Sequence, residues 1–541
     1  MKPLDTQTIA RYTDAGWWGT GTLSQRIAEH AASRPDTDAI VTPTGAMTYG
    51  EYHGAADRIV GQLADAGLRA GARVAVMMPD GPGVHATYVA IERLGGVVVG
   101  IGHRAGEREV RHLLALTGAE AIVTGPTIGH LEAGSFVSRL LDTSTDGLRH
   151  LLLADPSSNI PLLEGGRSPS LRVGNGCGIG PNDVFLMNST SGTTGLPKCV
   201  VHTQNRWFYF HRLAAEAGDL SSEDVVLSAV PAPFGFGLWT AHFTPTVLGC
   251  PVVLMPRFSA ELTLDLLERH RVTMLACVST QFIMLMNEQR ERPRDLSALR
   301  VMFTGGEAVP YDRAADFEER TGARVLQFYG SNETGALSVT TLRDDRRHRL
   351  TTAGRVIPEM NVRLLSEAGE SIERRPAQGV PACRGPATCL GYAGADGADS
   401  GLFTSDGWML MGDIVSIDED GYLRVIGRVS DFIIRGGKNI SAVAVEEEVA
   451  THPAVALAAA VPMQDPVFGE RVCAVVELRA GYQALSLEEL CDHLSARGVT
   501  REWHPERLIV RDELPRSSGG KVAKGVLRQE MRDWSELVER S

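Results

Sequence analysis

Apolar runs alternate with helix-like segments through the first half of the chain, and this alternation constrains the fold most strongly. Residues 71–80 (AGARVAVMMP) predict a buried strand, residues 86–101 a helix followed by a strand, and residues 107–125 the same pair again. Uninterrupted apolar runs between helical patterns are typical of parallel strands that helices cover on both faces. The later runs VVLSAVPAP, CPVVLMP and RVLQFYG continue the pattern. The first large unit is therefore predicted to be α/β.

The rest of the chain predicts two smaller units. A length of 541 residues exceeds one ordinary core. Residues 155–182, rich in Gly, Pro, Ser and Asn, predict a surface loop or linker, and residues 350–427 predict short strands of a small β-barrel-like unit. After residue 430 a helix, two strands and a helix predict a compact α+β unit. We expect an N-terminal domain over residues 1–428 and a small, mobile C-terminal domain over residues 429–541.

Composition excludes several classes of function. Lys plus Arg is 53 and Asp plus Glu is 66, a net charge of −13, which argues against a general nucleic-acid binder. The N-terminus has no signal-type apolar core, and no run of about 18 apolar residues predicts a membrane span. The 8 cysteines form no C-x-x-C pair, so neither a zinc site nor a disulfide framework is indicated. A cytoplasmic protein is expected.

The most informative loop is STSGTTGLPK, from Ser189 to Lys198. Small residues allow backbone N–H groups to surround a polyphosphate, while hydroxyl groups and a lysine add donors and a positive charge. The loop lacks the Gly-Lys-Ser/Thr of a Walker A motif. Alone it would more often be a polar linker, but the preceding strand VFLM and the Pro-Lys ending favour a phosphate site. The candidate ligands are Thr190, Ser191, Gly192, Thr193, Thr194, Gly195 and Lys198.

Four further motifs follow in order, and together with this loop they carry a resemblance. They are Gly305-Gly306-Glu307-Ala308, YGSNETG at 329–335, Gly412-Asp413 with Gly427-Arg428-x-x-Asp431, and LPRSSGGK at 514–521. The set resembles the adenylate-forming superfamily, which includes acyl- and aryl-CoA ligases, luciferase and the adenylation domains of peptide synthetases. Several motifs in the right order are far more specific than one.

The resemblance implies a role for each motif residue. Residues 1–428 would form the adenylation core that binds ATP and the acid, and residues 429–541 would carry the catalytic Lys521. Glu333 would be the second catalytic residue and would hold Mg²⁺, which prefers hard oxygen ligands. Asn332 stands where the family has Thr, and it can still donate to an α-phosphate oxygen. The implied nucleotide contacts also include Gly306, Glu307, Tyr329, Gly330, Asp413 and Arg428.

The resemblance also implies two half-reactions, formation of an acyl-AMP and its attack by a thiol. The C-terminal domain would swing about the hinge residue Ser430 and present Gly436 and Gly437 to the pantetheine arm of the thiol. Ser430, Ala442 and Ala444 depart from the usual residues of this segment. Cys199 stands where Gly is usual, and a small buried cysteine is a simpler interpretation than a reactive thiol.

The expected acid pocket lies in PAPFGFGLW, from Pro231 to Trp239. The pattern resembles benzoate-type ligases, and its rings suit a flat or cyclic acid. Trp239 itself could line the pocket or belong to the core. Ser279-Thr280-Gln281 would add polar groups near the pocket, suited to a hydroxyl or amino substituent. The pocket candidates are Phe234, Gly235, Phe236, Gly237, Ser279 and Gly305.

We therefore expect ATP-dependent activation of a carboxylic acid, aromatic or cyclic, followed by thioester formation with CoA. ATP, Mg²⁺ and CoA are the expected cofactors. One alternative is an enzyme that loads an acyl carrier protein, and another uses a different acid and nucleophile, such as nitrite with an arylamine. A non-catalytic binding protein is disfavoured, because Glu333, Asp413, Arg428 and Lys521 have no evident structural purpose.

Overall fold

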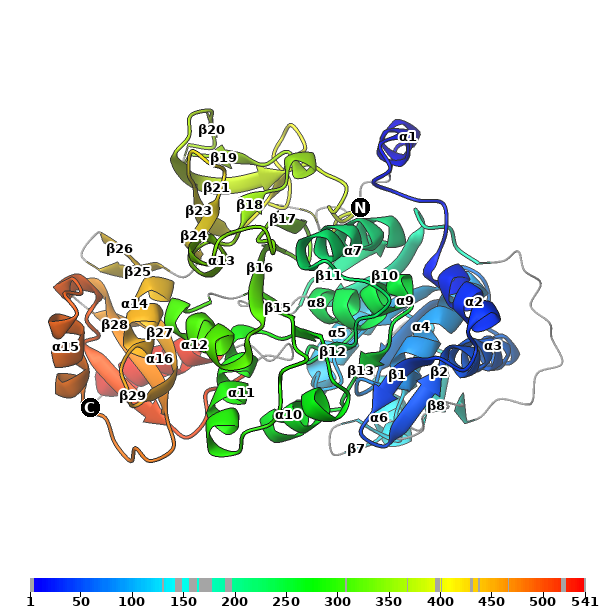
Figure 1. Ribbon diagram of the computed structural model, residues 1–541, viewed down its shortest axis with the longest axis horizontal. Coiled ribbons are helices and arrows are strands. Elements are labelled where there is room, and N and C mark those ends of the chain that lie inside the picture. Colours follow the sequence, from blue (N-terminus) through cyan, green and yellow to red (C-terminus); the bar gives the residue numbers. More distant parts are fainter. Residues whose placement is uncertain are drawn as a thin grey trace.

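The structure is a computed structural model whose element order is shown in Figure 1. It describes residues 4–128, 131–141, 148–154, 163–164, 178–189, 197–306, 309–366, 368–394, 399, 401–428, 432–435, 438–465, 467–516 and 522–539. Most of the linker expected at 155–182 lies outside these ranges. No helix within them is both long and apolar enough to cross a bilayer.

Two large sheets form the N-terminal part, and both are parallel in their centres. The first sheet has the order β11-β10-β4-β3-β5-β8-β9, and only its end strands β11 and β9 are antiparallel. Its bounds are β3 (Arg73–Met77), β4 (Val97–Gly100), β5 (Ala121–Thr124), β8 (His150–Ala154), β9 (Leu163–Glu164), β10 (Val184–Ser189) and β11 (Cys199–Thr203). The predicted strands at 71–80 and 86–125 are confirmed.

The second sheet has nine strands in the order β18-β17-β16-β15-β14-β12-β13-β1-β2. The strands from β16 to β1 are mutually parallel, and β17, β18 and β2 are antiparallel. Its bounds are β1 (Asp38–Thr42), β2 (Gly45–Thr48), β12 (Val226–Ser228), β13 (Val252–Val253), β14 (Met274–Ala276), β15 (Val301–Gly305), β16 (Arg324–Ser331), β17 (Gly335–Val339) and β18 (Arg355–Val356).

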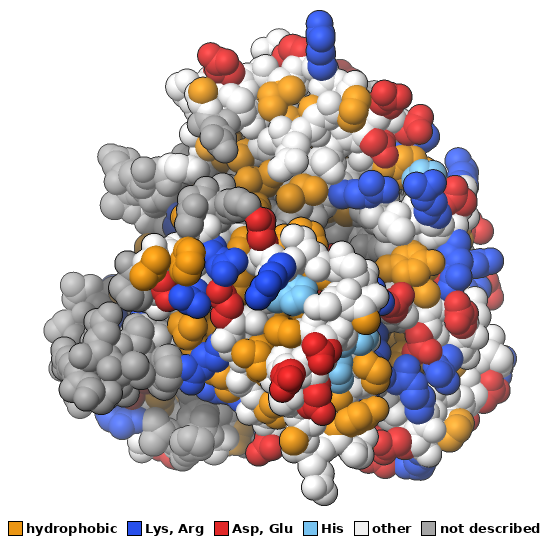
Figure 2. All heavy atoms as spheres, turned by 90° about the vertical axis from the view of Figure 1, so that its left-hand side faces the viewer, with side chains coloured by type: hydrophobic (Ala, Val, Ile, Leu, Met, Phe, Trp, Pro, Cys, Tyr) orange, Lys and Arg blue, Asp and Glu red, His pale blue; other side chains and the backbone are white. Residues whose placement is uncertain are grey.

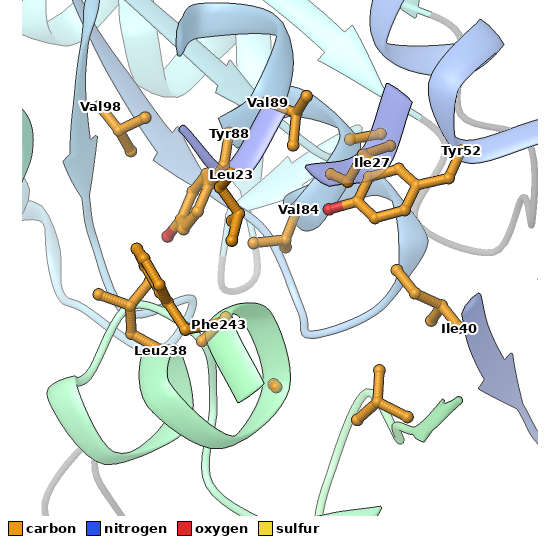
Figure 3. Packing of buried hydrophobic residues seen from close by; sticks show 14 of the residues in the cluster. Leu23, Ile27, Ile40, Tyr52, Val84, Tyr88, Val89, Val98, Leu238 and Phe243 are labelled. Carbon is orange, nitrogen blue, oxygen red and sulfur yellow. The ribbon is translucent and has the colours of Figure 1, made fainter. Parts of the chain in front are cut away.

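The main core lies between these sheets, where both contribute buried side chains to one cluster. Helices α2 (Leu23–Ser33), α3 (Tyr49–Asp65), α4 (Pro82–Leu94), α7 (Gln204–Gly218) and the π-helix η1 (Leu238–Phe243) fill the space between them. Figure 3 shows Tyr88 and Val98 on one side of this core, with Leu238 and Phe243 of η1 opposite. Helices also cover the outer faces, so each sheet is buried on both sides, as its apolar strands require.

The outer layers are formed by two sets of amphipathic helices. On the seven-stranded sheet they are α5 (Glu107–Thr117) and α6 (Ala133–Leu141). On the nine-stranded sheet they are α10 (Ala260–Arg269), α11 (Ser279–Glu291) and α12 (Tyr311–Thr321). The remaining N-terminal helices are α1 (Thr6–Asp14), α8 (Gly235–Gly237), α9 (Thr244–Leu248) and α13 (Arg346–Thr351).

The expected small β unit is an antiparallel sheet of six strands, seen at the top of Figure 1. Its strands are β19 (Arg363–Leu365), β20 (Ser371–Ile372), β21 (Ala377–Cys383), β22 (Met409–Leu410), β23 (Asp413–Ile417) and β24 (Leu423–Arg428). All their pairings are antiparallel. The chain then leaves this sheet and enters a different one at β25 (Phe432–Arg435).

The C-terminal unit is built on that second, five-stranded sheet. It comprises β25, β26 (Lys438–Ser441), β27 (Val455–Asp465), β28 (Gly469–Leu478) and β29 (Arg507–Arg511), with α14 (Ala442–Ala450), α15 (Leu487–Ala496) and α16 (Lys524–Glu539). It has its own core clusters. Arg313 of α12 joins it to the N-terminal part by donating to the backbone oxygens of Ala450 (2.9 Å) and Val455 (3.1 Å). Figure 2 views the molecule from this side and shows basic and acidic side chains interspersed.

Candidate active site

The site begins where β16 and β23 come together. Tyr329, near the end of β16, is 7% exposed, and its hydroxyl donates to Asp413 Oδ2 at 2.9 Å across 84 residues of sequence. The absence of a side chain at Gly330 allows β17 to pair closely with β16, because a Cβ there would lie 1.8 Å from the carbonyl oxygen of Gly335. Strand register also places Arg428 opposite Asp413. Asp413 and Arg428, both predicted to contact the nucleotide, therefore lie on adjacent strands, and Asp413 also contacts Tyr329, a third predicted nucleotide contact.

Glu333 lies in the turn between β16 and β17, and its carboxylate is held from one side. Tyr392 donates from its hydroxyl to Glu333 Oε1 at 2.8 Å, and Lys198 Nζ lies 4.4 Å from the centre of the Tyr392 ring. Burial, with the charge of Glu333, raises the pKa of Tyr392, so its hydroxyl remains a donor. Two residues of the sequence prediction, Lys198 and Glu333, are thus connected through Tyr392, which the prediction did not include.

The geometry around Glu333 fits the coordination chemistry of Mg²⁺. One carboxylate oxygen accepts from Tyr392, which leaves the second oxygen for a cation. Within the described residues, no group of three or more His, Cys, Asp or Glu side chains is arranged to hold a metal ion. Mg²⁺ is commonly held by one or two carboxylates together with phosphate oxygens and water. A single anchored carboxylate is therefore suited to a metal that arrives with a polyphosphate.

A buried polar network lies directly behind this turn. The guanidinium of Arg206, which is 2% exposed, donates to the backbone oxygens of Ala387 (2.8 Å) and Asn332 (3.0 Å) and also contacts His202 Nδ1. His202 Nε2 lies 2.6 Å from Asn188 Oδ1, and Asn332 Nδ2 donates to the same oxygen at 2.7 Å. The side chain of Asn332 is thus oriented by buried groups of α7, β10 and β11.

Burial shifts the pKa values within this network. It lowers the pKa of His202 well below its usual value, and the charge of Arg206 lowers it further. Burial also lowers the pKa of Arg206, to about 10, which leaves the guanidinium protonated at neutral pH. The network therefore contains one cation and a neutral imidazole.

The aromatic segment lies against the same turn. A Cβ on Gly235 would be 2.7 Å from Asn332 Oδ1 and 3.1 Å from the Trp207 ring. Gly237 is also closely packed, because a Cβ there would lie 2.1 Å from the carbonyl oxygen of Pro231. Phe234, Gly235 and Phe236 retain intermediate exposure, whereas Gly237 is buried.

Trp239 is a core residue in this structure. Its side chain is 0% exposed, and it stacks on Phe236 with ring centroids 5.6 Å apart. The rings of Phe210, Phe303 and Phe328 meet it edge-on at 5.1, 5.4 and 4.9 Å. The alternative left open by the sequence is thereby resolved, and Phe236 is the ring that separates Trp239 from the surface. Such clusters of edge-to-face rings stabilise a rigid wall.

The other polar candidates near the pocket have mostly structural partners. Ser279 and Thr280 are buried at the start of α11. Gln281 accepts from the backbone N–H of Val278 (3.0 Å) and donates to the backbone oxygen of Ala229 (2.8 Å), so it caps the helix and ties it to the nine-stranded sheet. Gly305 ends β15, where a Cβ would lie 2.7 Å from the carbonyl oxygen of Phe328.

Cys199 is a structural cysteine, as the sequence favoured. It is 0% exposed, and burial raises the pKa of its thiol to about 12. A thiol with such a pKa carries almost no thiolate at neutral pH, so it is a poor nucleophile. None of the cysteines within the described ranges forms a disulfide.

Several predicted residues have no described side chain, and their roles stay predictions. Gly306 is described and has a φ of +81°. For Arg428 the structure describes the strand position and not the side chain. Outside the described residues lie Thr190, Ser191, Gly192, Thr193, Thr194, Gly195, Glu307, Ser430, Gly436, Gly437 and Lys521.

Sequence reasoning missed four residues that the structure brings to the site, Asn188, His202, Arg206 and Tyr392. Asn188 is the next-to-last residue of β10, near the phosphate loop, and polar residues close to a strand end commonly face a ligand. His202 lies in β11 and Arg206 in the first turn of α7, so the contact between them depends on the strand-to-helix junction at residues 203–204. Tyr392 carries no comparable local signal, because its importance depends on a contact with Glu333, 59 residues away.

Comparison with known proteins agrees with this arrangement. The profile of the AMP-binding enzyme family matches residues 27–393, and that of the AMP-binding enzyme C-terminal domain matches residues 444–521. A salicylyl-CoA synthase/salicylate adenylyltransferase of Streptomyces is 33% identical over 552 aligned positions, covering 99% of this chain and 98% of the relative. An indoleacetate–CoA ligase of Aromatoleum aromaticum is 32% identical over 515 positions, covering 94% of this chain and 98% of the relative.

Solved structures share the same fold. An anthranilate CoA ligase in complex with anthranoyl-AMP superimposes with a TM-score of 0.85 at 21% identity, covering 96% of this chain and 98% of that one. At this identity the likeness concerns the fold alone. The two matching profiles, the full-length relatives and the site built around Tyr329, Glu333 and Asp413 lead to one conclusion: this chain belongs to the AMP-binding enzyme family, the adenylate-forming superfamily.

Proposed function

We propose that this enzyme activates an aromatic carboxylic acid with ATP and transfers the acyl group to the thiol of CoA. The observation that carries the proposal is the contact between the aromatic segment and the nucleotide motif. The site for Gly235 Cβ lies 2.7 Å from Asn332 Oδ1, and Asn332 immediately precedes Glu333. An acid bound along the aromatic segment would therefore have its carboxylate close to the polyphosphate end of the nucleotide.

The proposed chemistry has two steps. A carboxylate oxygen of the acid attacks the α-phosphorus of ATP, and the bond to the β-phosphate breaks, which releases pyrophosphate and leaves acyl-AMP. The sulfur of the thiol, having lost its proton, then attacks the acyl carbon, and AMP leaves with the electron pair of the broken C–O bond. Mg²⁺ would supply positive charge to the phosphate oxygens when bound. Glu333 would hold it, and Tyr392 would fix the carboxylate that does so.

The other predicted roles extend this scheme. Asp413 would accept hydrogen bonds from the ribose, with Tyr329 holding its second oxygen in place. Lys198 and residues 190–195 would bind phosphates, and Lys521 would neutralise charge between the carboxylate and the α-phosphate. Gly436 and Gly437 would contact the thiol after rotation at Ser430. The proposed place of action is the cytoplasm, where ATP and CoA are both available.

A carrier protein is the second candidate for the thiol acceptor, because relatives of this chain differ in their acceptor. A salicyl-AMP ligase/salicyl-S-ArCP synthetase of Mycobacterium tuberculosis is 29% identical over 541 positions, covering 97% of this chain and 94% of the relative. Its degree of similarity is close to that of the CoA ligases. The acceptor therefore has to be decided by experiment.

The experiment measures pyrophosphate and AMP released from ATP with a panel of benzoates, indole acids, cinnamates and linear acids, each with and without CoA. Nitrite with an arylamine belongs in the panel. We expect AMP release with aromatic acids, strongly accelerated by CoA, and a thioester detectable by mass spectrometry. AMP release at the same rate with and without CoA would instead favour a carrier protein as the thiol acceptor. Turnover with linear acids or nitrite alone would contradict the aromatic assignment.

Lys521→Ala tests the assignment of the catalytic lysine. The variant should lose acyl-AMP formation and still convert supplied acyl-AMP to thioester. Lys524→Met is the matched control, since the Lys524 amine pairs with Glu446 at 2.7 Å in the C-terminal unit. Equal loss of both steps in folded Lys521→Ala would contradict the role.

A further inference from the structure

We infer that the amide of Asn332 is a specificity element that presents a hydrogen-bond acceptor to the acid, selecting aromatic acids with a donor next to the carboxylate. The inference rests on the proposed function and names its substrate class. The inference follows from the orientation of the Asn332 amide, and this orientation is determined by buried neighbouring residues.

The orientation is set by Arg206, which can only donate. Its guanidinium contacts His202 Nδ1, so this nitrogen must be the acceptor and the proton of the neutral imidazole must be on Nε2. His202 Nε2 is 2.6 Å from the Asn188 side chain, so the atom there must accept and is Oδ1. The assignment of Asn188 is supported independently, because its Nδ2 donates to the backbone oxygen of Pro233 at 2.8 Å.

The same logic determines Asn332. Asn188 Oδ1 is an acceptor, so the atom of Asn332 that approaches it at 2.7 Å must be the donor Nδ2. The Oδ1 of Asn332 is then left on the other side of the amide, facing Gly235. Its remaining contact within the network is long, 3.4 Å from Asn188 Nδ2. A carbonyl oxygen with two lone pairs can accept a further, shorter hydrogen bond.

Gly235 and the Asn332 amide are sterically complementary. Any side chain at 235 would place its Cβ 2.7 Å from Asn332 Oδ1, inside contact distance. Glycine therefore makes room for the amide between the aromatic segment and the 331–335 turn. Both residues keep intermediate exposure, so the amide lies at the border of the core and not inside it.

The position of the amide determines where a substrate donor would have to be. Asn332 and Glu333 are neighbours in the sequence, so their Cα atoms are about 3.8 Å apart. The two residues therefore lie at the same end of the aromatic segment. That end is where the proposed chemistry places the carboxylate and the α-phosphate. The donor should therefore be ortho to the carboxyl group, as a hydroxyl or primary amine, with the ring along Phe236. A methoxy group or hydrogen at this position would leave the amide oxygen with only its long contact to Asn188 Nδ2.

The test compares acids that differ only in this donor: benzoate, 2-methoxybenzoate, 2-hydroxybenzoate, 2-aminobenzoate and 4-hydroxybenzoate. The measured quantities are kcat/KM for pyrophosphate release and, by calorimetry without ATP, the Kd of each acid. We expect the wild type to favour the ortho-donor acids over 2-methoxybenzoate and 4-hydroxybenzoate by about tenfold in both quantities. The ratio should fall to about one in Asn332→Leu.

Two further variants keep the inference falsifiable if Asn332→Leu does not fold. Asn332→Val removes the amide and leaves no side-chain acceptor, and Gly235→Ala displaces the amide through the new Cβ. Both should lower the same ratio. Asn287→Leu is the matched control, since Asn287 lies on the surface of α11 and pairs with Arg290.

The outcomes separate the inference from the proposed function. Equal use of donor and non-donor benzoates by the wild type would overturn the inference and leave the proposed function standing. A preference that persists in Asn332→Leu or Asn332→Val would also overturn it, because the donor would then be recognised elsewhere. Activity of the wild type with no aromatic acid would instead refute the proposed function.

Discussion

Replacing Tyr392 by phenylalanine removes one hydroxyl group and keeps the ring, so it isolates the hydrogen bond to Glu333. The hydroxyl donates to Glu333 Oε1 at 2.8 Å, and the ring lies 4.4 Å from Lys198 Nζ. Tyr392 is 8% exposed, which limits replacement of the lost donor by bulk water. The cation–π contact with Lys198 survives in phenylalanine, since it depends on the ring face.

The size of the effect follows from the charge of the acceptor. Hydrogen bonds to charged groups contribute about 1.5–3 kcal/mol, and the lower end applies here because a bound cation can partly satisfy the carboxylate. About 1.4 kcal/mol corresponds to a tenfold change, so kcat/KM for Mg–ATP should fall about tenfold in Tyr392→Phe. Tyr392→Leu also loses the contact with Lys198 and should fall further.

The assay measures pyrophosphate release against Mg–ATP at saturating acid, and against free Mg²⁺ at saturating ATP. We expect the midpoint of the Mg²⁺ dependence to rise in Tyr392→Phe, with little change in thermal unfolding. Tyr422→Phe is a matched control, because Tyr422 donates to Asp344 at 2.6 Å outside the site. An unchanged Mg²⁺ dependence in Tyr392→Phe, combined with a loss in Tyr392→Leu, would refute the reasoning and leave Tyr392 a packing residue only.

Three further variants test other parts of the molecule. Asp413→Asn should keep the bond from Tyr329, lose the negative charge and raise KM for ATP roughly tenfold in the same assay, with the KM for the acid unchanged. Trp239→Ala should destabilise the N-terminal domain by about 3–5 kcal/mol in denaturant unfolding, because it empties a fully buried aromatic cluster. Burial lowers the pKa of His211 from 6.5 to about 4, so below pH 6.5 the unfolded chain binds a proton that the folded protein does not. Stability should therefore fall by up to about 3 kcal/mol between pH 6.5 and 4, and His211→Gln should show a weaker pH dependence over this range.

The fold could be predicted from sequence where its signals are local. The strands β3, β4 and β5 and the helices between them follow directly from apolar runs and helical periodicity. The change to an antiparallel β unit follows from shorter runs and closer turns. The order of strands could not be predicted this way, since Val252 of β13 pairs with Ile40 of β1, which lies 212 residues earlier in the chain. Pairing of that kind is decided by packing of complete units.

The site was predictable to the extent that its residues lie in motifs. Tyr329, Glu333 and Asp413 were expected from short patterns, and the structure places Tyr329 and Asp413 in direct contact. Tyr392 was not predicted, because no pattern near residue 392 reports its bond to Glu333. The polar segment after β14 was interpreted as part of the pocket, yet Gln281 uses its amide to cap α11. A polar side chain near a pocket can satisfy backbone groups instead of a ligand, and only its hydrogen bonds distinguish the two.

Arg206 connects the part of the site that would hold Mg²⁺ with the part that would recognise the acid. Its guanidinium donates to the backbone oxygens of Asn332 and Ala387, and at 3.4 Å to that of Glu333. It therefore joins α7 to the turn that carries Glu333 and to the loop that leads to Tyr392. The cost of burying this cation is offset only while all these oxygens stay in place. The same cation determines the proton position on His202 and hence the direction of the Asn332 amide. The carboxylate that would hold Mg²⁺ and the amide that would recognise the acid thus depend on one buried charge, so their geometries cannot vary independently.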